Sequence, residues 1–136
     1  MAQPVPAQRM EHVIRTYIQA CNDADTEAIA ASLCPEAVHY SPSGLQWSGA
    51  ATIASHFVKI IREQGYSWTV DQLLINVDRC AATLEWTRFN RQGARIVRGV
   101  DWFVFEPQTF RIQEVRVYTG TPVQPDMARE ARLDCD

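Results

Sequence analysis

The chain has 136 residues, with 13 basic and 16 acidic side chains and a formal net charge of −3. This length predicts one domain, which can bury roughly 65 to 70% of its unfolded surface without disulfides or metal. No stretch combines Lys or Arg with aromatic residues as a phosphate-tracking surface requires, so we expect no nucleic-acid partner. No segment reaches transmembrane length, so we expect no membrane partner either.

The two ends of the chain are predicted to lie outside the folded domain. Residues 1–8, "MAQPVPAQ", have no basic region and no continuous apolar stretch, which indicates a disordered leader and not a secretion signal. Residues 121–136 contain Pro122 and Pro125 and are predicted to form a surface tail.

The cysteines bear on the compartment and on metal binding. The four cysteines are Cys21, Cys34, Cys80 and Cys135, and no two of them are spaced as CxxC. Such isolated cysteines are typically small buried hydrophobic residues of a protein in a reducing compartment. We therefore expect a cytoplasmic protein that holds no metal and uses no cofactor.

Three helices are predicted in the first half of the chain. Apolar side chains recur every three or four residues over about 8–22, the pattern of an amphipathic helix. Asp23 or Asp25 can cap a short second helix, which Pro35 prevents from continuing. A third helix is predicted over residues 49–65, "GAATIASHFVKIIREQG", with the final glycine as its stop.

The strands are predicted mainly in the second half. Residues 37–44, "AVHYSPSG", indicate a short strand that ends in a Pro/Gly loop. Four later stretches are rich in Val, Ile, Thr and aromatic residues, at about 66–78, 81–90, 94–106 and 110–119. Their short connections favour antiparallel neighbours. The apolar parity changes between Val70 and Leu73, which predicts a bulge near Asp71 or Gln72 that bends the sheet.

Helices followed by a strand meander predict an α+β domain with helices on one face of a curved antiparallel sheet. This order of elements resembles the nuclear transport factor 2-like superfamily, in its SnoaL-like and ketosteroid isomerase-like branch. The segments that carry the resemblance are "RTYIQACNDADTEAIAASLCPEAVHYSPSG", "GVDWFVFE" and "RIQEVRVYTG". It implies a cone-shaped single domain over about residues 9–120, in which a strongly curved antiparallel sheet packs against three N-terminal helices. Such patterns identify a fold better than a reaction.

The resemblance also implies candidate catalytic residues. Tyr17 of "RTYIQACN" falls where ketosteroid isomerases have the tyrosine of their oxyanion hole. Asp101 of "GVDWFVFE" falls where they keep a protonated aspartic acid. Their aspartate base is replaced here by Ser41, which argues against steroid-type isomerisation. His39, two residues earlier, can replace that base because its ordinary pKa is near neutral.

The alternation of side chains along strands selects further residues for the pocket. Together with His56 of the third predicted helix, the expected substrate-binding residues are Ser41, Trp86, Arg88, Phe103 and Val117. The resemblance places Arg88 and Val117 where epoxide hydrolases of this superfamily have their water-activating aspartates. Because neither residue is a carboxylate, we expect no epoxide hydrolysis by that mechanism.

Two structural interpretations of Asp101 remain open beside the functional one. An ionised carboxylate among apolar side chains is costly, so Asp101 must be protonated, or bonded to Arg88, Tyr17 or His39. The alternatives are a purely structural ion pair with Arg88, or a carboxylate that faces solvent.

These observations predict a small cofactor-independent enzyme. It would act by acid-base chemistry on a hydrophobic, oxygenated small molecule through an enol or enolate, in a cyclisation, isomerisation or dehydration. His39 would move the proton, Asp101 and Tyr17 would stabilise the oxyanion, and Arg88 would orient a polar end. The alternative is a non-catalytic ligand-binding or dimerisation domain of the same fold. An enclosed pocket that brings Asp101, Tyr17 and His39 together would favour the enzyme hypothesis. A cone filled by apolar side chains would favour the non-catalytic domain.

The opposite face of the sheet has its own prediction. Val100, Trp102 and Val104 share the parity that points away from the pocket. Such an apolar patch is unfavourable in water, which predicts a homodimer formed through the outer sheet face.

Overall fold

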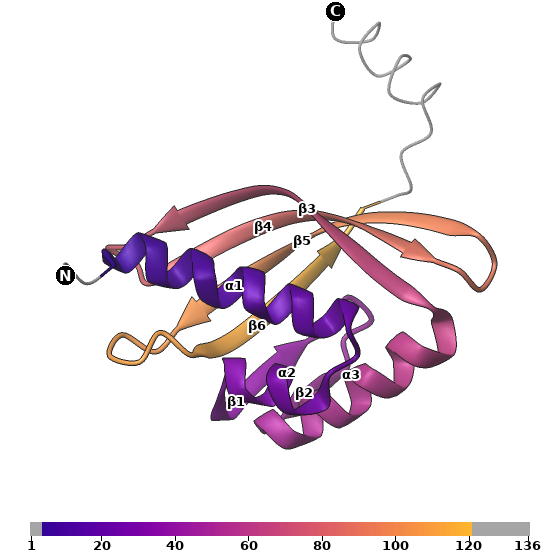
Figure 1. Ribbon diagram of the computed structural model, residues 1–136, viewed down its shortest axis with the longest axis horizontal. Coiled ribbons are helices and arrows are strands. Elements are labelled where there is room, and N and C mark those ends of the chain that lie inside the picture. Colours follow the sequence, from indigo (N-terminus) through magenta and orange to yellow (C-terminus); the bar gives the residue numbers. More distant parts are fainter. Residues whose placement is uncertain (1–3, 121–136) are drawn as a thin grey trace, which may run out of the picture.

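The computed structural model describes residues 4–120, which form three helices and six strands (Figure 1). In chain order these are α1 (Pro6–Asn22), α2 (Thr26–Ser32), β1 (Leu33–Tyr40), β2 (Gln46–Ser48), α3 (Ala50–Gln64), β3 (Tyr66–Asn76), β4 (Ala81–Asn90), β5 (Arg95–Phe105) and β6 (Ile112–Thr119). The α+β class is confirmed. The predicted C-terminal tail, 121–136, lies outside the described residues.

The strands form one open sheet in the order β2-β1-β6-β5-β4-β3. The sheet was predicted to be antiparallel, and all its pairings are except that of β1 with β6, which is parallel, so the sheet is mixed. The chain leaves β1 through β2 and α3 and re-enters the sheet at its far edge as β3. The meander then returns toward β1, which places the last strand beside the first. The three-residue strand β2 lies just after the predicted Pro/Gly loop and was too short to detect.

Several local predictions are confirmed. The register of β3 against β4 shifts between Val70 and Gln72, where the bulge was expected. The Asp25 carboxylate caps α2 by accepting the Ala28 backbone N–H at 3.1 Å. Gly65 ends α3 in the left-handed conformation, with φ 65°. The bulge sets which residues of β3 face the interior, and the two caps set where α2 begins and where α3 ends.

Helix α1 begins earlier than predicted. It starts at Pro6, so residues 6–8 are helical and do not belong to a disordered leader. A proline suits the first helical turn because it has no N–H to leave unpaired. The Val5 backbone N–H is also bonded, to Gln8 Oε1 at 3.1 Å. Residues 1–3 lie outside the described part of the chain.

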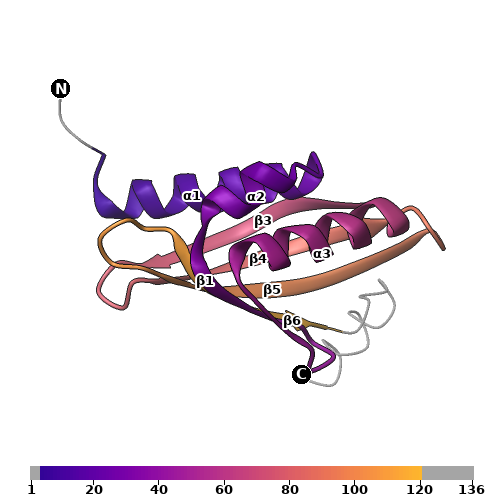
Figure 2. The same ribbon diagram turned by 90° about the horizontal axis from the view of Figure 1, so that it is seen from below.

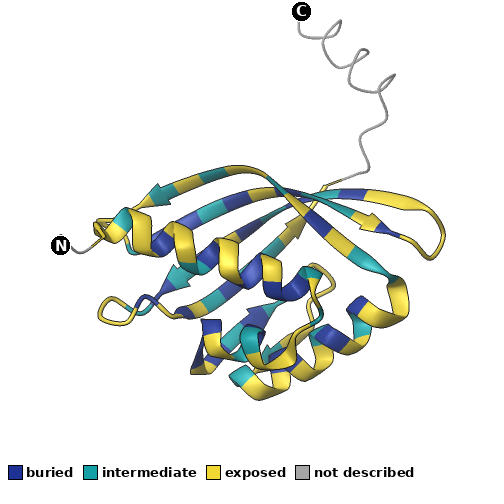
Figure 3. Cartoon of the chain, viewed as in Figure 1, coloured by how far each residue is buried: buried dark blue, intermediate teal, exposed yellow. Residues whose placement is uncertain are grey.

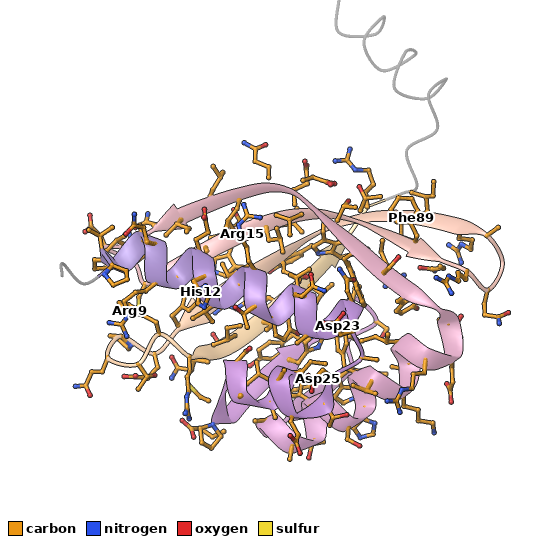
Figure 4. The ribbon with its side chains drawn as sticks, viewed as in Figure 1. Arg9, His12, Arg15, Asp23, Asp25 and Phe89 are labelled. Atoms are coloured by element: carbon orange, nitrogen blue, oxygen red, sulfur yellow. The ribbon has the colours of Figure 1, made fainter. Side chains whose placement is uncertain are left out.

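The helices cover one side of the curved sheet (Figure 2). Buried and exposed residues alternate along α1, as its amphipathic pattern predicts (Figure 3). Its exposed side carries polar side chains, Arg9, His12 and Arg15 (Figure 4). No helix among residues 4–120 is long and apolar enough to cross a membrane.

The outer sheet face is partly apolar and partly charged. Trp102 is 42% exposed there. Arg98 forms ion pairs with Asp71 and Glu85, and Arg116 pairs with Glu114.

The cysteines were predicted to be buried. Cys21 and Cys34 are buried and Cys80 is half-buried, while Cys135 lies outside the described residues.

Candidate functional site

An apolar cavity of about 160 Å³ lies between the concave face of the sheet and the helices. Seven of the nine predicted site residues line it: Tyr17, His39, Ser41, Trp86, Arg88, Asp101 and Val117. They come from α1, from β1 and the loop that follows it, and from β4, β5 and β6. The cone is therefore not filled by its own side chains.

Two predicted residues lie elsewhere. Phe103 is fully buried in the core, where its ring meets Tyr17 edge-on at a centroid distance of 5.9 Å. His56 is exposed on α3 and stacks on Trp47 at 5.3 Å. Its chain neighbour Phe57 lines the cavity instead, because adjacent helical residues point about 100° apart.

Asp101 is the buried carboxyl of the site. It lies on β5 between Leu84 of β4 and Val117 of β6, and it is 8% exposed. Its Oδ1 accepts a hydrogen bond from Trp86 Nε1 at 3.0 Å. Burial raises the pKa of Asp101 from 3.8 to about 7, against the opposing effects of the Trp86 bond and the charge of Arg88. The carboxyl thus fits neither structural alternative: it does not face solvent, and no ion pair joins it to Arg88.

Gly99 explains how Trp86 reaches that carboxyl. The two residues are cross-strand partners, and a Cβ on Gly99 would lie 2.5 Å from Trp86 Cη2 and 2.7 Å from the Tyr118 carbonyl oxygen. Without a side chain at this position, the indole can lie against the strand and bond Asp101 two residues further along β5. Neither Gly99 nor the donor role of Trp86 was predicted. The glycine inside "RGVDWFVFE" was the available signal.

Tyr17 contributes a buried hydroxyl whose neighbour is the Cys21 thiol, a weak hydrogen-bonding group, and no oxygen or nitrogen among the described residues bonds it. The residue is 1% exposed and comes from the inward side of α1. Burial raises its pKa well above the usual value, and Cys21 and Asp101 nearby add to the effect. The phenol is therefore neutral at physiological pH, and a ligand oxygen would be a stronger acceptor for its O–H than the Cys21 sulfur. Cys21, one turn later on α1, also lines the cavity and was not predicted.

His39 is a buried imidazole, and neither of its ring nitrogens has a partner among the described residues. It is 4% exposed, stacks on Trp47 at 5.4 Å and meets Phe57 edge-on at 5.3 Å. Burial lowers its pKa from 6.5 to about 4, so the ring is neutral at physiological pH. Trp47 and Phe57 form its aromatic surroundings and were not predicted for the site.

Arg88 supplies the positive charge. Its side chain is half-buried, and the Nε donates to Asn90 Oδ1 at 2.8 Å. The guanidinium lies over the Tyr66 ring, 3.9 Å from its centroid, and 5.9 Å from that of Trp86. Within residues 4–120 no carboxylate pairs with it. Burial lowers its pKa.

One side of the cavity lies near solvent. Pro42 and Thr119 are exposed where they line it, and Ser41 is half-buried beside them. The Ser41 hydroxyl bonds that of Ser43 at 2.8 Å. Within the described part of the chain, no three His, Cys, Asp or Glu side chains gather as a metal site requires.

The comparisons with known proteins agree with this architecture. The chain belongs to the SnoaL-like domain family of the nuclear transport factor 2-like superfamily, whose family model matches residues 14–115. Among curated proteins, none matches the chain significantly.

Solved structures resemble it along most of its length. A protein of unknown function with a cystatin-like fold, from Methylobium petroleophilum PM1, is 35% identical; the match covers 93% of this chain and 86% of that one, with a TM-score of 0.82. A candidate polyketide cyclase from Xanthomonas campestris is 19% identical over 84% of this chain and 92% of its own, with a TM-score of 0.71. A candidate ketosteroid isomerase from Kribbella flavida is 18% identical over 88% and 83%, with a TM-score of 0.71. At these lower identities the likeness shows the fold alone.

Proposed function

We propose that this protein is an acid-base enzyme that acts on a hydrophobic, oxygenated small molecule through an enol or enolate. The observation that carries the proposal is one apolar cavity that contains a carboxyl with a pKa of about 7 and two buried polar side chains to which no oxygen or nitrogen of the described residues is bonded. Buried polar groups without partners are costly in a folded protein. A ligand that bonds them would remove that cost.

Asp101 and Tyr17 would bind the ligand's carbonyl oxygen. Below about pH 7 the Asp101 carboxyl carries a proton, and one of its oxygens already accepts from Trp86. The other oxygen can then donate its O–H to the ligand, together with the Tyr17 hydroxyl. Donors held in an apolar site stabilise the negative charge that develops on this oxygen when an enolate forms.

His39 would act as the base. Its neutral ring accepts a proton from the carbon next to the carbonyl group; the C–H bond breaks, and its electron pair moves through the new C=C bond onto the carbonyl oxygen. The imidazolium and the enolate form together, so the cavity gains no net charge. With a pKa of about 4 in the folded protein, the imidazolium is a strong acid that readily returns the proton.

The fate of the enolate decides the reaction class. In isomerisation the His39 imidazolium returns its proton to another carbon. In cyclisation the enolate carbon forms a bond to a second carbonyl carbon, and the imidazolium protonates the resulting alkoxide. In dehydration the C–O bond of a β-hydroxyl breaks, and the imidazolium supplies the proton with which it leaves as water. The proton that His39 removes is thus the one that each reaction consumes. The proposal therefore includes no cofactor, and activity should survive treatment with a chelator.

Hydrogen exchange tests the proposal before the natural substrate is known. Cyclohexanone is an enolisable ring ketone, and its α-hydrogens can be followed by NMR in deuterated buffer. The protein should accelerate their exchange, and Asp101→Asn or His39→Gln should each reduce the enzymatic rate on the order of a hundredfold. His12→Gln, on the exposed side of α1, is the matched control and should keep the rate.

A second candidate function is ligand binding without turnover. The low pKa of His39 and the serine at the position of the isomerases' aspartate favour it, because both weaken the available base. In that case cyclohexanone would bind the wild-type protein and its exchange would stay at the rate of buffer alone.

A further inference from the structure

The charge of Arg88 is not balanced within the cavity. The cavity lining contains one other group that can carry charge near neutral pH, the Asp101 carboxyl. No ion pair joins the two side chains. A half-buried guanidinium is normally paired or bonded to acceptors, because burial makes an isolated charge costly. Asn90 satisfies one nitrogen of Arg88, which leaves the terminal nitrogens for another acceptor.

The guanidinium is held in a defined position. Asn90 fixes its Nε, and the Tyr66 ring supports its flat face. An arginine that stacks in this way presents its N–H edge, which matches the two oxygens of a carboxylate. The arrangement is thus suited to an anion and not only to a packing contact.

Arg88 of β4 and Asp101 of β5 both line the cavity. Arg88 is opposite Val97, and Asp101 is opposite Leu84, so the two side chains start four positions apart in the register of β4 and β5. Along a strand this is about 13 Å between Cα atoms, before the side chains reach inward. Trp86 comes between Leu84 and Arg88 along β4 and also lines the cavity. A ligand that bonds both Arg88 and Asp101 needs a polar group at each of its own ends and an apolar middle part.

The size of the cavity limits that middle part. Its volume is about 160 Å³, and a cavity of roughly 150 Å³ accommodates a benzene ring. One six-membered ring fits, with its polar substituents directed toward Asp101 and Arg88.

From these contacts we infer that the ligand is a ring-sized keto acid, whose carboxylate is bound by Arg88 and whose carbonyl oxygen faces Asp101 and Tyr17. The position of the carbonyl end rests on the proposed function, whereas the carboxylate at Arg88 rests on the unpaired guanidinium alone. A carboxylate there gains charge-assisted hydrogen bonds that a neutral group of the same shape cannot make.

Two matched probes test the inference: 4-oxocyclohexanecarboxylate and its neutral amide, titrated into the protein by calorimetry. The wild-type protein should bind the carboxylate roughly tenfold to a hundredfold more tightly than the amide. Arg88→Gln should abolish the difference, and Arg88→Lys should keep part of it. Arg98→Gln removes the same charge from the outer sheet face and should retain the full preference, as solvent and salt screen that position.

Each outcome decides the inference. Equal affinity of the wild-type protein for the two probes, or no binding of the carboxylate, would overturn it without any variant. A preference that persists in folded Arg88→Gln would also overturn it. Exchange of cyclohexanone, which has no carboxylate, tests the proposed chemistry separately, so failure of one proposal is distinguishable from failure of the other.

Discussion

Replacing Asp101 by Asn should change how the free energy of unfolding depends on pH. Burial raises the pKa of Asp101 from 3.8 to about 7, so between these values the folded protein holds a proton that the unfolded chain has released. Stability therefore falls as pH rises through this window, by about 1.4 kcal/mol per pH unit and by roughly 4 kcal/mol in all. The asparagine variant has no such proton to lose, while its amide oxygen can still accept from Trp86.

Urea unfolding at a series of pH values, followed by tryptophan fluorescence, measures this effect. The free energy of the wild-type protein minus that of Asp101→Asn should decrease by about 3 kcal/mol between about pH 5 and about pH 8. Groups common to both proteins cancel in the difference. A difference that stays constant within about 0.5 kcal/mol would refute a raised pKa at Asp101.

His39→Gln should change the pH dependence of the free energy of unfolding in the opposite direction to Asp101→Asn. Burial lowers the pKa of His39 from 6.5 to about 4, so the unfolded chain binds the extra proton between these values. The stability due to neutral His39 is fully present above about pH 6.5 and is lost as pH falls toward about 4, by about 3 kcal/mol. The advantage of the wild-type protein over this variant should therefore grow with pH. An advantage that shrinks would contradict the buried, neutral imidazole.

Three further outcomes are expected. Gly99→Ala should lower the free energy of unfolding by about 1 to 3 kcal/mol, because the new Cβ would collide with the Trp86 ring and the Tyr118 carbonyl oxygen. Gly120→Ala is the control and should leave stability unchanged, because its new Cβ would lie 3.9 Å from the nearest atom, the Arg98 carbonyl oxygen. Trp86→Phe removes a hydrogen bond that lowers the pKa of Asp101, so an NMR titration of that carboxyl should give a value above about 7, and an unchanged value would count against the bond. We predict that the wild-type protein sediments as a homodimer through the outer sheet face, where Trp102 is 42% exposed, and that Trp102→Glu sediments as a monomer. A monomeric wild-type protein would exclude that interface.

Strand alternation predicted most of the cavity. Once β4 and β5 were assigned, the period of two residues directed Trp86, Arg88 and Asp101 to the same face, and all three line the cavity. The parity change in β3 likewise predicted its bulge. These predictions depend on local geometry, which the residue pattern contains.

The errors concern tertiary contacts. The parallel pairing of β1 with β6 depends on where the chain re-enters the sheet, which no local pattern records. The bond from Trp86 to Asp101 depends on the space above Gly99, a property of two strands together. His56 was expected in the pocket, but its neighbour Phe57 lines the cavity and His56 is exposed, since adjacent helical residues point about 100° apart.

The central claim is that protonated Asp101 and neutral His39 act together on a carbonyl compound. The pH dependence of cyclohexanone exchange tests it most directly. The rate catalysed by the wild-type protein should fall below about pH 4, where His39 is protonated, and above about pH 7, where Asp101 is ionised. Asp101→Asn should lose the upper limb, and His39→Gln the lower one. A catalysed rate that does not depend on pH between about 3 and 9, or that keeps both limbs in the two variants, would contradict the account.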